Sequence, residues 1–164
     1  MSNNPQVALF TGTFDPPSLG HWEIIQRAVQ LFDQLYIGVA LGNVKATLGL
    51  SLGDRVDLLK ALTLPLENVQ VIEMPGLAVD CASECQAKYL VRGIRNASDF
   101  DYEDQMAAFN RQLTGVETVV FLASPQYSHI SSTLIREIAA QGHRLKGFVP
   151  DVIEEAIFRK FSRQ

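Results

Sequence analysis

The most informative stretch of the sequence is GTFDPPSLGH, residues 12–21. It follows an apolar run, Val7–Thr11, that predicts a buried strand, and it precedes an amphipathic pattern, Trp22–Phe32, that predicts a helix. A glycine-containing loop between a strand and a helix suits phosphate, because the helix N-terminus presents free N–H groups. A cationic or N–H-donating imidazole at His21 would stabilise charge on a transferring phosphoryl oxygen. The alternative is a tight turn whose histidine only caps the helix.

The rest of the chain alternates further apolar runs with helical patterns. Strands are expected at Leu35–Leu41, Val69–Glu73, Tyr89–Arg92 and Thr118–Leu122. Helices are expected from Ser51 to Leu62, at Leu77–Gln86, Asp99–Leu113 and Ser132–Gln141, and from Pro150 to Phe161. The expected strands are rich in Val, Leu and Ile without strict alternation, which is typical of strands that are covered on both faces. We predict an α/β fold with a doubly wound, parallel five-stranded sheet, helices on both faces and a C-terminal helix, in a single domain over residues 1–164.

Composition narrows the class of protein. The chain has 164 residues, 47% hydrophobic, and a formal net charge of −4, which weighs against nucleic acid as a partner. No apolar run is long enough for a membrane span, and no secretory signal is recognisable, so we expect a soluble, cytoplasmic protein. Cys81 and Cys85 are interpreted as buried free thiols rather than a redox pair or half of a metal site.

The first loop resembles the nucleotidyltransferase superfamily that carries the (H/T)xGH motif, a Rossmann-like group. The resemblance implies that His21 contacts the α-phosphate of ATP and stabilises the transition state. It also implies that Thr13 binds both ATP and the phosphate of the acceptor, and that Phe14 belongs to the ATP site. Ser18 departs from the motif, since it stands where the family has His or Thr. The loop matches neither the dinucleotide-binding nor the P-loop pattern.

The segment VRGIRNASDFDYEDQMAAFNRQL, residues 91–113, resembles the phosphopantetheine adenylyltransferase family. Arg92 and Arg95 end a predicted strand, where guanidinium groups suit phosphate oxygens; surface ion pairs are the alternative. The resemblance implies that Arg92 binds phosphopantetheine. It further assigns to the ATP site Gly93, Ile94, Arg95 and Glu103.

Three other segments carry weaker matches. Lys45 follows the second predicted strand, and the resemblance gives it a catalytic role as a point charge near the transferring phosphate and a part in binding the substrate; an exposed loop lysine is the alternative. Ala78 matches a contact of the pantetheine arm, and a simple helix start is the alternative. The segment YSHISSTLIRE, from Tyr127, is rich in hydroxyls at a predicted helix start, where a cap alone is the alternative. The resemblance places on ATP the residues Tyr127, Ser128, His129, Ile130, Ser131, Ser132 and Thr133.

The resemblance as a whole implies an enzyme of coenzyme A biosynthesis. It would move AMP from ATP to 4′-phosphopantetheine, giving dephospho-coenzyme A and pyrophosphate by direct in-line attack without a covalent intermediate. Mg²⁺ is the expected cofactor, with no protein ligands assigned, and the expected assembly is a homohexamer. Two alternatives stay open: a nicotinate-mononucleotide adenylyltransferase, which shares the first loop, and a non-catalytic nucleotide-binding sensor.

Overall fold

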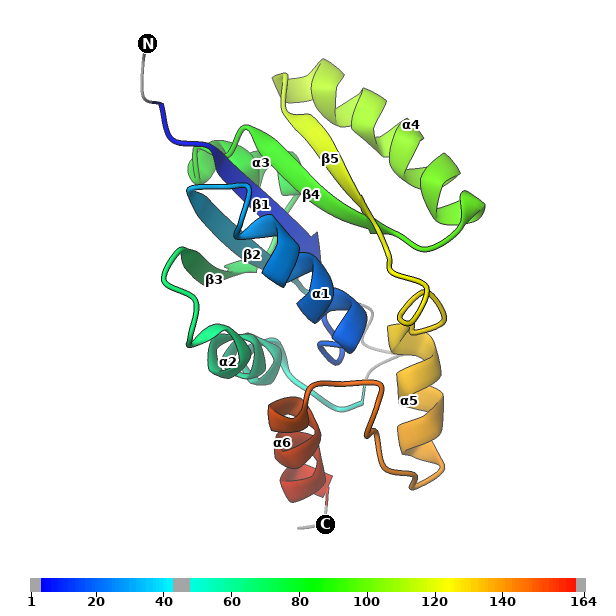
Figure 1. The fold of residues 1–164 in the computed structure, drawn as a ribbon. Coiled ribbons are helices and arrows are strands. Elements are labelled where there is room, and N and C mark those ends of the chain that lie inside the picture. Colours follow the sequence, from blue (N-terminus) through cyan, green and yellow to red (C-terminus); the bar gives the residue numbers. More distant parts are fainter. Residues whose placement is uncertain (1–3, 43–47, 162–164) are drawn as a thin grey trace.

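A computed structural model describes residues 4–42 and 48–161 of the chain (Figure 1). Its five strands form one sheet in the order β3-β2-β1-β4-β5, and every neighbouring pair is parallel. The strands are β1 (Val7–Gly12), β2 (Gln34–Ala40), β3 (Val69–Met74), β4 (Tyr89–Ile94) and β5 (Glu117–Leu122). The predicted doubly wound parallel sheet is confirmed.

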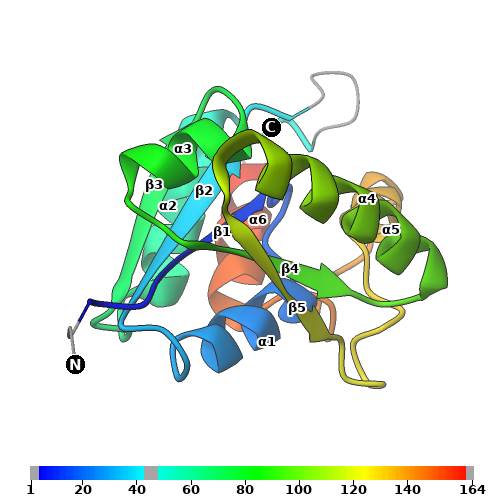
Figure 2. The ribbon, with the colours of Figure 1, turned by 90° about the horizontal axis from the view of Figure 1, so that it is seen from above.

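Helices cover both faces of this sheet. They are α1 (Leu19–Ala28), α2 (Leu52–Thr63), α3 (Ala78–Glu84), α4 (Ala97–Thr114), α5 (Ser132–Ala140) and the C-terminal α6 (Asp151–Phe161). Figure 2 shows α3 and α4 on one side of the strands and α1 on the other. Among the described residues, no helix is at once long enough and apolar enough to cross a membrane.

Alternate residues of the central strands enter two separate apolar clusters, because successive side chains of a strand point to opposite faces. Ala8 and Phe10 of β1 pack in the larger cluster, together with residues of α1, α2, α5 and α6. Leu9, between them, packs in the smaller cluster with Val79 and Ala82 of α3. The two clusters explain why the strands are apolar on both faces.

Helix α1 begins earlier than the sequence pattern predicts. The pattern indicates Trp22 as its first residue, but the helix starts at Leu19 and ends at Ala28. Ser18 is the N-cap: its hydroxyl accepts a hydrogen bond from the His21 N–H at 3.2 Å, and its own N–H donates to His21 Nδ1 at 3.0 Å. This reciprocal cap closes the first turn and places His21 inside it. The bounds of the other helices agree with prediction within about two residues.

The sheet order determines where a ligand fits. The chain winds outward from β1 through β2 and β3 on one side and through β4 and β5 on the other. At such a switch of direction, the loops after two neighbouring central strands diverge to opposite faces and leave a crevice at the carboxyl edge of the sheet. Here that crevice lies beyond the ends of β1 and β4.

Candidate active site

A cavity of about 760 Å³ occupies this edge of the sheet. Its wall combines the ends of β1 and β4, the first turn of α1, the start of α4 and the segment that leads into α5. The volume falls in the range of pockets that bind cofactor-sized molecules. Twelve of the predicted site residues line it: Thr13, His21, Arg92, Gly93, Ile94, Arg95, Glu103, Tyr127, Ile130, Ser131, Ser132 and Thr133.

The helix cap sets the protonation of His21. Its Nδ1 accepts the Ser18 N–H and therefore carries no proton, which leaves the proton on Nε2. Burial, with the nearby cations Arg95 and Arg92, lowers the pKa of the imidazole from 6.5 to about 4. The Phe14 ring packs against the imidazole at a centroid distance of 4.8 Å in an edge arrangement. His21 is thus a neutral, rigidly held N–H donor at neutral pH, one of the two states expected from the sequence.

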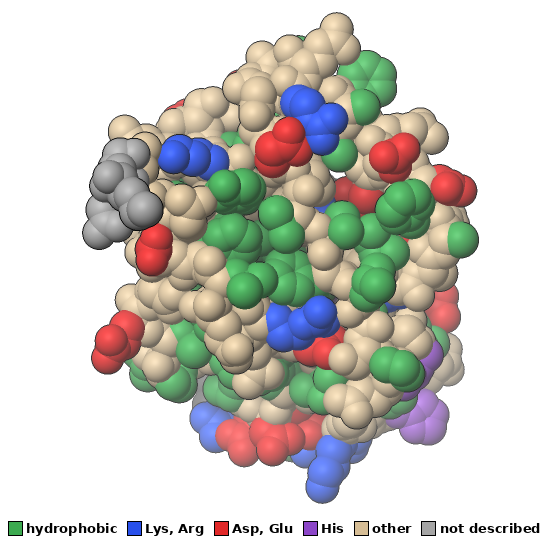
Figure 3. Space-filling view, turned by 45° about the horizontal axis from the view of Figure 1, so that its top comes forward, with side chains coloured by type: hydrophobic (Ala, Val, Ile, Leu, Met, Phe, Trp, Pro, Cys, Tyr) green, Lys and Arg blue, Asp and Glu red, His purple; other side chains and the backbone are tan. Residues whose placement is uncertain are grey.

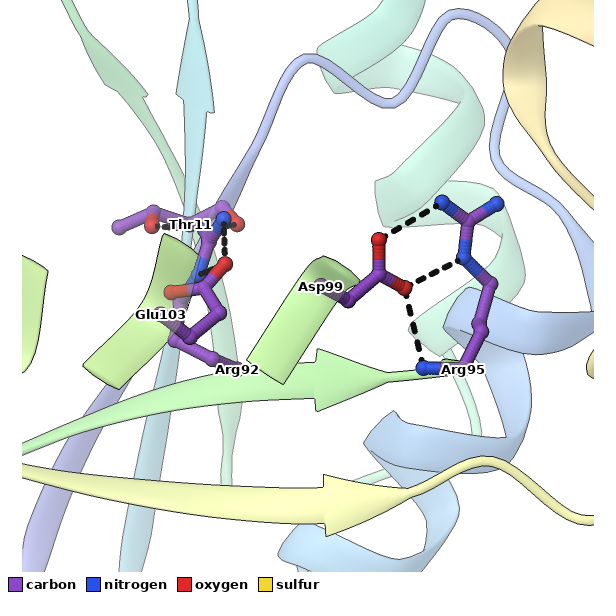
Figure 4. Close-up of polar contacts among 5 residues, drawn as sticks. All are labelled: Thr11, Arg92, Arg95, Asp99 and Glu103. Atoms are coloured by element: carbon purple, nitrogen blue, oxygen red, sulfur yellow. Dashed lines mark hydrogen bonds and ion pairs between the residues drawn. The ribbon is translucent and has the colours of Figure 1, made fainter. Parts of the chain in front are cut away.

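Arg92 is bound to two neighbours from different elements (Figure 4). Its Nε and Nη2 donate to Glu103 Oε1 of α4 at 2.9 and 2.7 Å. Its Nη1 donates to the carbonyl and the hydroxyl of Thr11 in β1 at 2.8 and 2.9 Å. The Glu103 side chain is nearly buried, with a relative exposure of 9%, and that of Arg92 is 30% exposed. These bonds hold the guanidinium at the cavity wall in one orientation.

Arg95, three residues after Arg92, is likewise held by a carboxylate and a backbone carbonyl. Asp99, in the first turn of α4, accepts from the Arg95 backbone N–H and from its Nε, both at 3.0 Å (Figure 4). Arg95 Nη1 donates to the carbonyl of Ile130 at 3.3 Å, which links the loop between β4 and α4 to the segment before α5. The guanidinium lowers the pKa of the Asp99 carboxyl through hydrogen bonds and charge, against the opposing effect of burial. Two guanidinium groups therefore face one cavity beside His21.

The segment before α5 contributes residues with hydroxyl groups to the wall of the same cavity. Ser131 is the N-cap of α5, and its Oγ accepts from the Leu134 N–H at 3.1 Å. Ser132 and Thr133 follow it in the first turn and also line the cavity. The cap that the sequence suggested as an alternative is present, and it coexists with cavity-facing hydroxyls and a helix N-terminus.

Four predicted site residues lie away from the cavity. Phe14 is 1% exposed, and its ring lies against Gly12 below the loop. Ser128 donates from its hydroxyl to the Pro125 carbonyl, His129 packs edge-on against Phe148, and Ala78 begins α3 beside the smaller apolar cluster. None of these four is among the residues that line the cavity. Lys45 lies outside the described residues.

Comparisons with known proteins agree with this geometry. The model of the cytidylyltransferase-like family matches residues 9–138, which include every cavity segment described above. A phosphopantetheine adenylyltransferase from Caldanaerobacter subterraneus is 42% identical over 96% of this chain and 99% of its own. Another, from Moorella thermoacetica, is 41% identical over 95% of this chain and 98% of its own. The chain belongs to the phosphopantetheine adenylyltransferase family.

Two further matches help to define the limits of the likeness. A relative with the same family name from Dichelobacter nodosus is 44% identical over 93% of this chain and 95% of its own. A crystal structure from Vibrio parahaemolyticus, described under the name nicotinate-nucleotide adenylyltransferase, superposes with a TM-score of 0.68 over 94% of this chain and 99% of its own. It is 20% identical, so it shows a shared fold alone.

Several cavity residues of this family member were not identified from its sequence as site residues. Ser18 orients His21, and Asp99 orients Arg95, as described above. Both have a local signal: a serine three residues before a helical histidine, and an aspartate four residues after an arginine. Tyr102 lines the cavity from α4 without a comparable signal, because only the path of that helix brings it there.

Proposed function

We propose that this chain is a phosphopantetheine adenylyltransferase, which transfers AMP from ATP to 4′-phosphopantetheine and releases pyrophosphate. One observation carries the proposal. His21, Arg92 and Arg95, which come from separate parts of the chain, meet around one cavity at the carboxyl edge of the sheet. Relatives above 40% identity over nearly the whole chain bear the name of this activity.

The proposed binding mode divides the cavity between the two substrates. ATP lies along the α5 side, with its phosphates near the hydroxyls of Ser131–Thr133 and near Arg95. Gly93 and Ile94 at the end of β4 border the nucleotide, and Glu103 acts through Arg92. The acceptor phosphate lies between Thr13 and Arg92. The cavity positions of these residues and the likeness to the family support this division.

The proposed reaction is one in-line displacement. An oxygen of the acceptor phosphate forms a bond to the α-phosphorus of ATP, while the bond from that phosphorus to the β-phosphate oxygen breaks and pyrophosphate leaves with the electron pair. The Nε2–H of His21 donates to a non-bridging α-phosphate oxygen, where charge develops. Arg92 and Arg95 hold the two reactants in line and lower their mutual repulsion. Lys45 is proposed to act at the same phosphates.

The expected Mg²⁺ ion is assigned to ATP rather than to the protein. Among residues 4–42 and 48–161, no group of three His, Cys, Asp or Glu side chains is arranged to hold a metal. Asp99 and Glu103, which line the cavity, are bound to Arg95 and Arg92. Phosphate oxygens and water are ligands that Mg²⁺ prefers, and the ion would neutralise charge on the polyphosphate.

An acceptor-dependent pyrophosphate assay tests the function. Purified protein is incubated with ATP, Mg²⁺ and either 4′-phosphopantetheine or nicotinate mononucleotide, and both pyrophosphate and the adenylylated product are measured. We expect turnover when 4′-phosphopantetheine is the acceptor and none when nicotinate mononucleotide is. Turnover with nicotinate mononucleotide instead would identify the other adenylyltransferase. ATP binding without turnover on either acceptor would leave the nucleotide sensor.

Assembly and location complete the proposal. We assign the chain to a single domain, to the cytoplasm and to a homohexamer. Free thiols at Cys81 and Cys85 support a reducing compartment. Exposed apolar side chains on α4 and β5 support an assembly: Phe109 is 62%, Leu113 65% and Leu122 66% exposed. Figure 3 shows hydrophobic side chains gathered on one face with charged groups around them. Light scattering of the purified protein tests the hexamer.

A further inference from the structure

A buried arginine of α2 lies directly behind the loop that carries Thr13. Arg55 is 4% exposed, an unusual degree of burial for a charged side chain. Its Nη1 donates to the carbonyl of Thr13 at 2.5 Å and to that of Ala40 at 2.7 Å. Its Nη2 donates to the carbonyl of Leu41 at 2.8 Å. One guanidinium therefore joins the loop after β1 to the end of β2.

The segments that Arg55 joins belong to the cavity. Thr13 and Ala40 line it, and Leu41 leads from Ala40 into the loop that follows β2. Gly42, which follows Leu41, has a φ of +78°, and a β-carbon at this position would lie in van der Waals contact with Thr13 and Arg55 Nη1. The distance between the two segments is thus set by the planar fork of Arg55.

Arg55 forms no ion pair with a carboxylate in the described part of the chain. The ion pairs found there do not include Arg55, and its Nε is buried without a hydrogen-bond partner. A buried cation that is satisfied only by carbonyl groups is costly to maintain. Such a cation is better tolerated behind a site that binds polyanions, because their phosphates supply opposite charge.

We infer that Arg55 is a positioning residue of the transfer site, which holds Thr13 and the end of β2 at the separation that the acceptor phosphate requires. This inference rests on the proposed function, since it concerns the same site. A lysine would keep the charge at this position, but its three N–H donors diverge from one nitrogen and cannot reproduce the fixed spacing of Nη1 and Nη2 in the planar guanidinium. The geometry of the guanidinium, rather than its charge, is the property that we assign to Arg55.

The test compares Arg55→Lys with Leu59→Ala. Leu59 lies on the same helix with 0% exposure, in the larger apolar cluster, so its truncation destabilises α2 without touching the loop carbonyls. For Arg55→Lys we expect kcat to fall at least tenfold and the KM for 4′-phosphopantetheine to rise at least fivefold, while the Kd for ATP changes less than threefold. Leu59→Ala should lower Tm with kcat and both substrate affinities close to wild type. Arg55→Lys kinetics that match those of Leu59→Ala would reduce Arg55 to a stability role and overturn the inference.

Hydrogen exchange separates this inference from the proposed function. In the ligand-free protein, Arg55→Lys should exchange faster than wild type and Leu59→Ala in the peptide that covers residues 12–18. Unchanged exchange there would overturn the positioning role even if the wild-type enzyme is active. Absence of wild-type turnover would instead overturn the proposed function and leave the exchange result interpretable.

If Arg55→Lys does not fold, Gly42→Ala supplies the second variant. A β-carbon at a φ of +78° strains the backbone next to the Leu41 carbonyl that Arg55 binds. For Gly42→Ala we expect the KM for 4′-phosphopantetheine to rise, by less than the fivefold expected for Arg55→Lys, and the Kd for ATP to stay unchanged. Wild-type kinetics in folded Gly42→Ala would overturn the inference.

Discussion

Replacing His21 by alanine removes one N–H donor from the wall of the cavity, together with the acceptor of the Ser18 N–H and the contact with the Phe14 ring. Its backbone N–H still donates to Ser18, so the first turn of α1 keeps half of its cap. The lost donor is held rigidly, because Nδ1 is bound to the Ser18 backbone. Loss of one preorganised transition-state donor costs roughly 3–4 kcal/mol, which is about a 10²- to 10³-fold drop in kcat. We expect a fall of this size, with the KM for ATP changed much less.

The assay is acceptor-dependent release of pyrophosphate at saturating ATP and 4′-phosphopantetheine. Two further variants serve as controls in this assay. His21→Gln places an amide N–H near the former Nε2 and should recover part of the lost rate. His143→Ala changes an exposed histidine beyond α5 and should behave as wild type. A folded His21→Ala enzyme within about threefold of the wild-type kcat would refute the assigned role of the imidazole.

Three other predictions concern stability. The unfolded chain protonates His21 near pH 6.5, but the folded chain does so only near pH 4. The free energy of unfolding should therefore fall by roughly 3 kcal/mol as the pH drops through that window. In urea titrations, this loss should be smaller in His21→Gln than in wild type. In Gly93→Ala, the new β-carbon would collide with Ile24 Cδ1, which is the end of a buried but rotatable side chain, so the cost should be about 1 kcal/mol. Ile24→Val removes that methyl group, so the double variant should be more stable than Gly93→Ala alone, and a further loss of Tm would contradict the contact. Glu103→Gln leaves Arg92 without its carboxylate partner and should lower the free energy of unfolding by about 2 kcal/mol. Glu155→Gln, in an exposed ion pair, should change it by less than about 0.5 kcal/mol. Equal effects of the two substitutions in chemical denaturation would contradict a stabilising role of the Arg92–Glu103 pair.

The sheet could be predicted from the sequence because each strand is a short run rich in apolar residues without strict alternation. Covered parallel strands need such runs, and residues as far apart as Val7 and Phe121 obey the same rule. The start of α1 could not be predicted to the residue. Its cap uses His21 where the familiar pattern has Glu or Gln, so the hydrophobic periodicity alone suggested a later beginning.

Twelve residues that line the cavity could be named from the sequence, but the partners that hold them could not. Arg92 and Arg95 were expected at a strand end, and the cavity lies there. That Arg92 would bind Glu103 and Thr11 depends on how α4 crosses the sheet, and no local spacing encodes that crossing. Arg55 could not be predicted as a site residue either, because its partners are backbone carbonyls, which no residue type in the sequence indicates.

The reciprocal cap between Ser18 and His21 also limits the chemistry of the acceptor. The lone pair of Nδ1 is committed to a backbone amide, so the ring edge that meets the cavity can give a hydrogen bond but cannot remove a proton. An alcohol shaped like the natural acceptor would need to be deprotonated before attack, whereas a phosphate monoester arrives already ionised. Pantetheine lacking its phosphate should therefore fail as a nucleophile even when it occupies the site. The first turn of α1 thus restricts the reaction to acceptors that are already ionised.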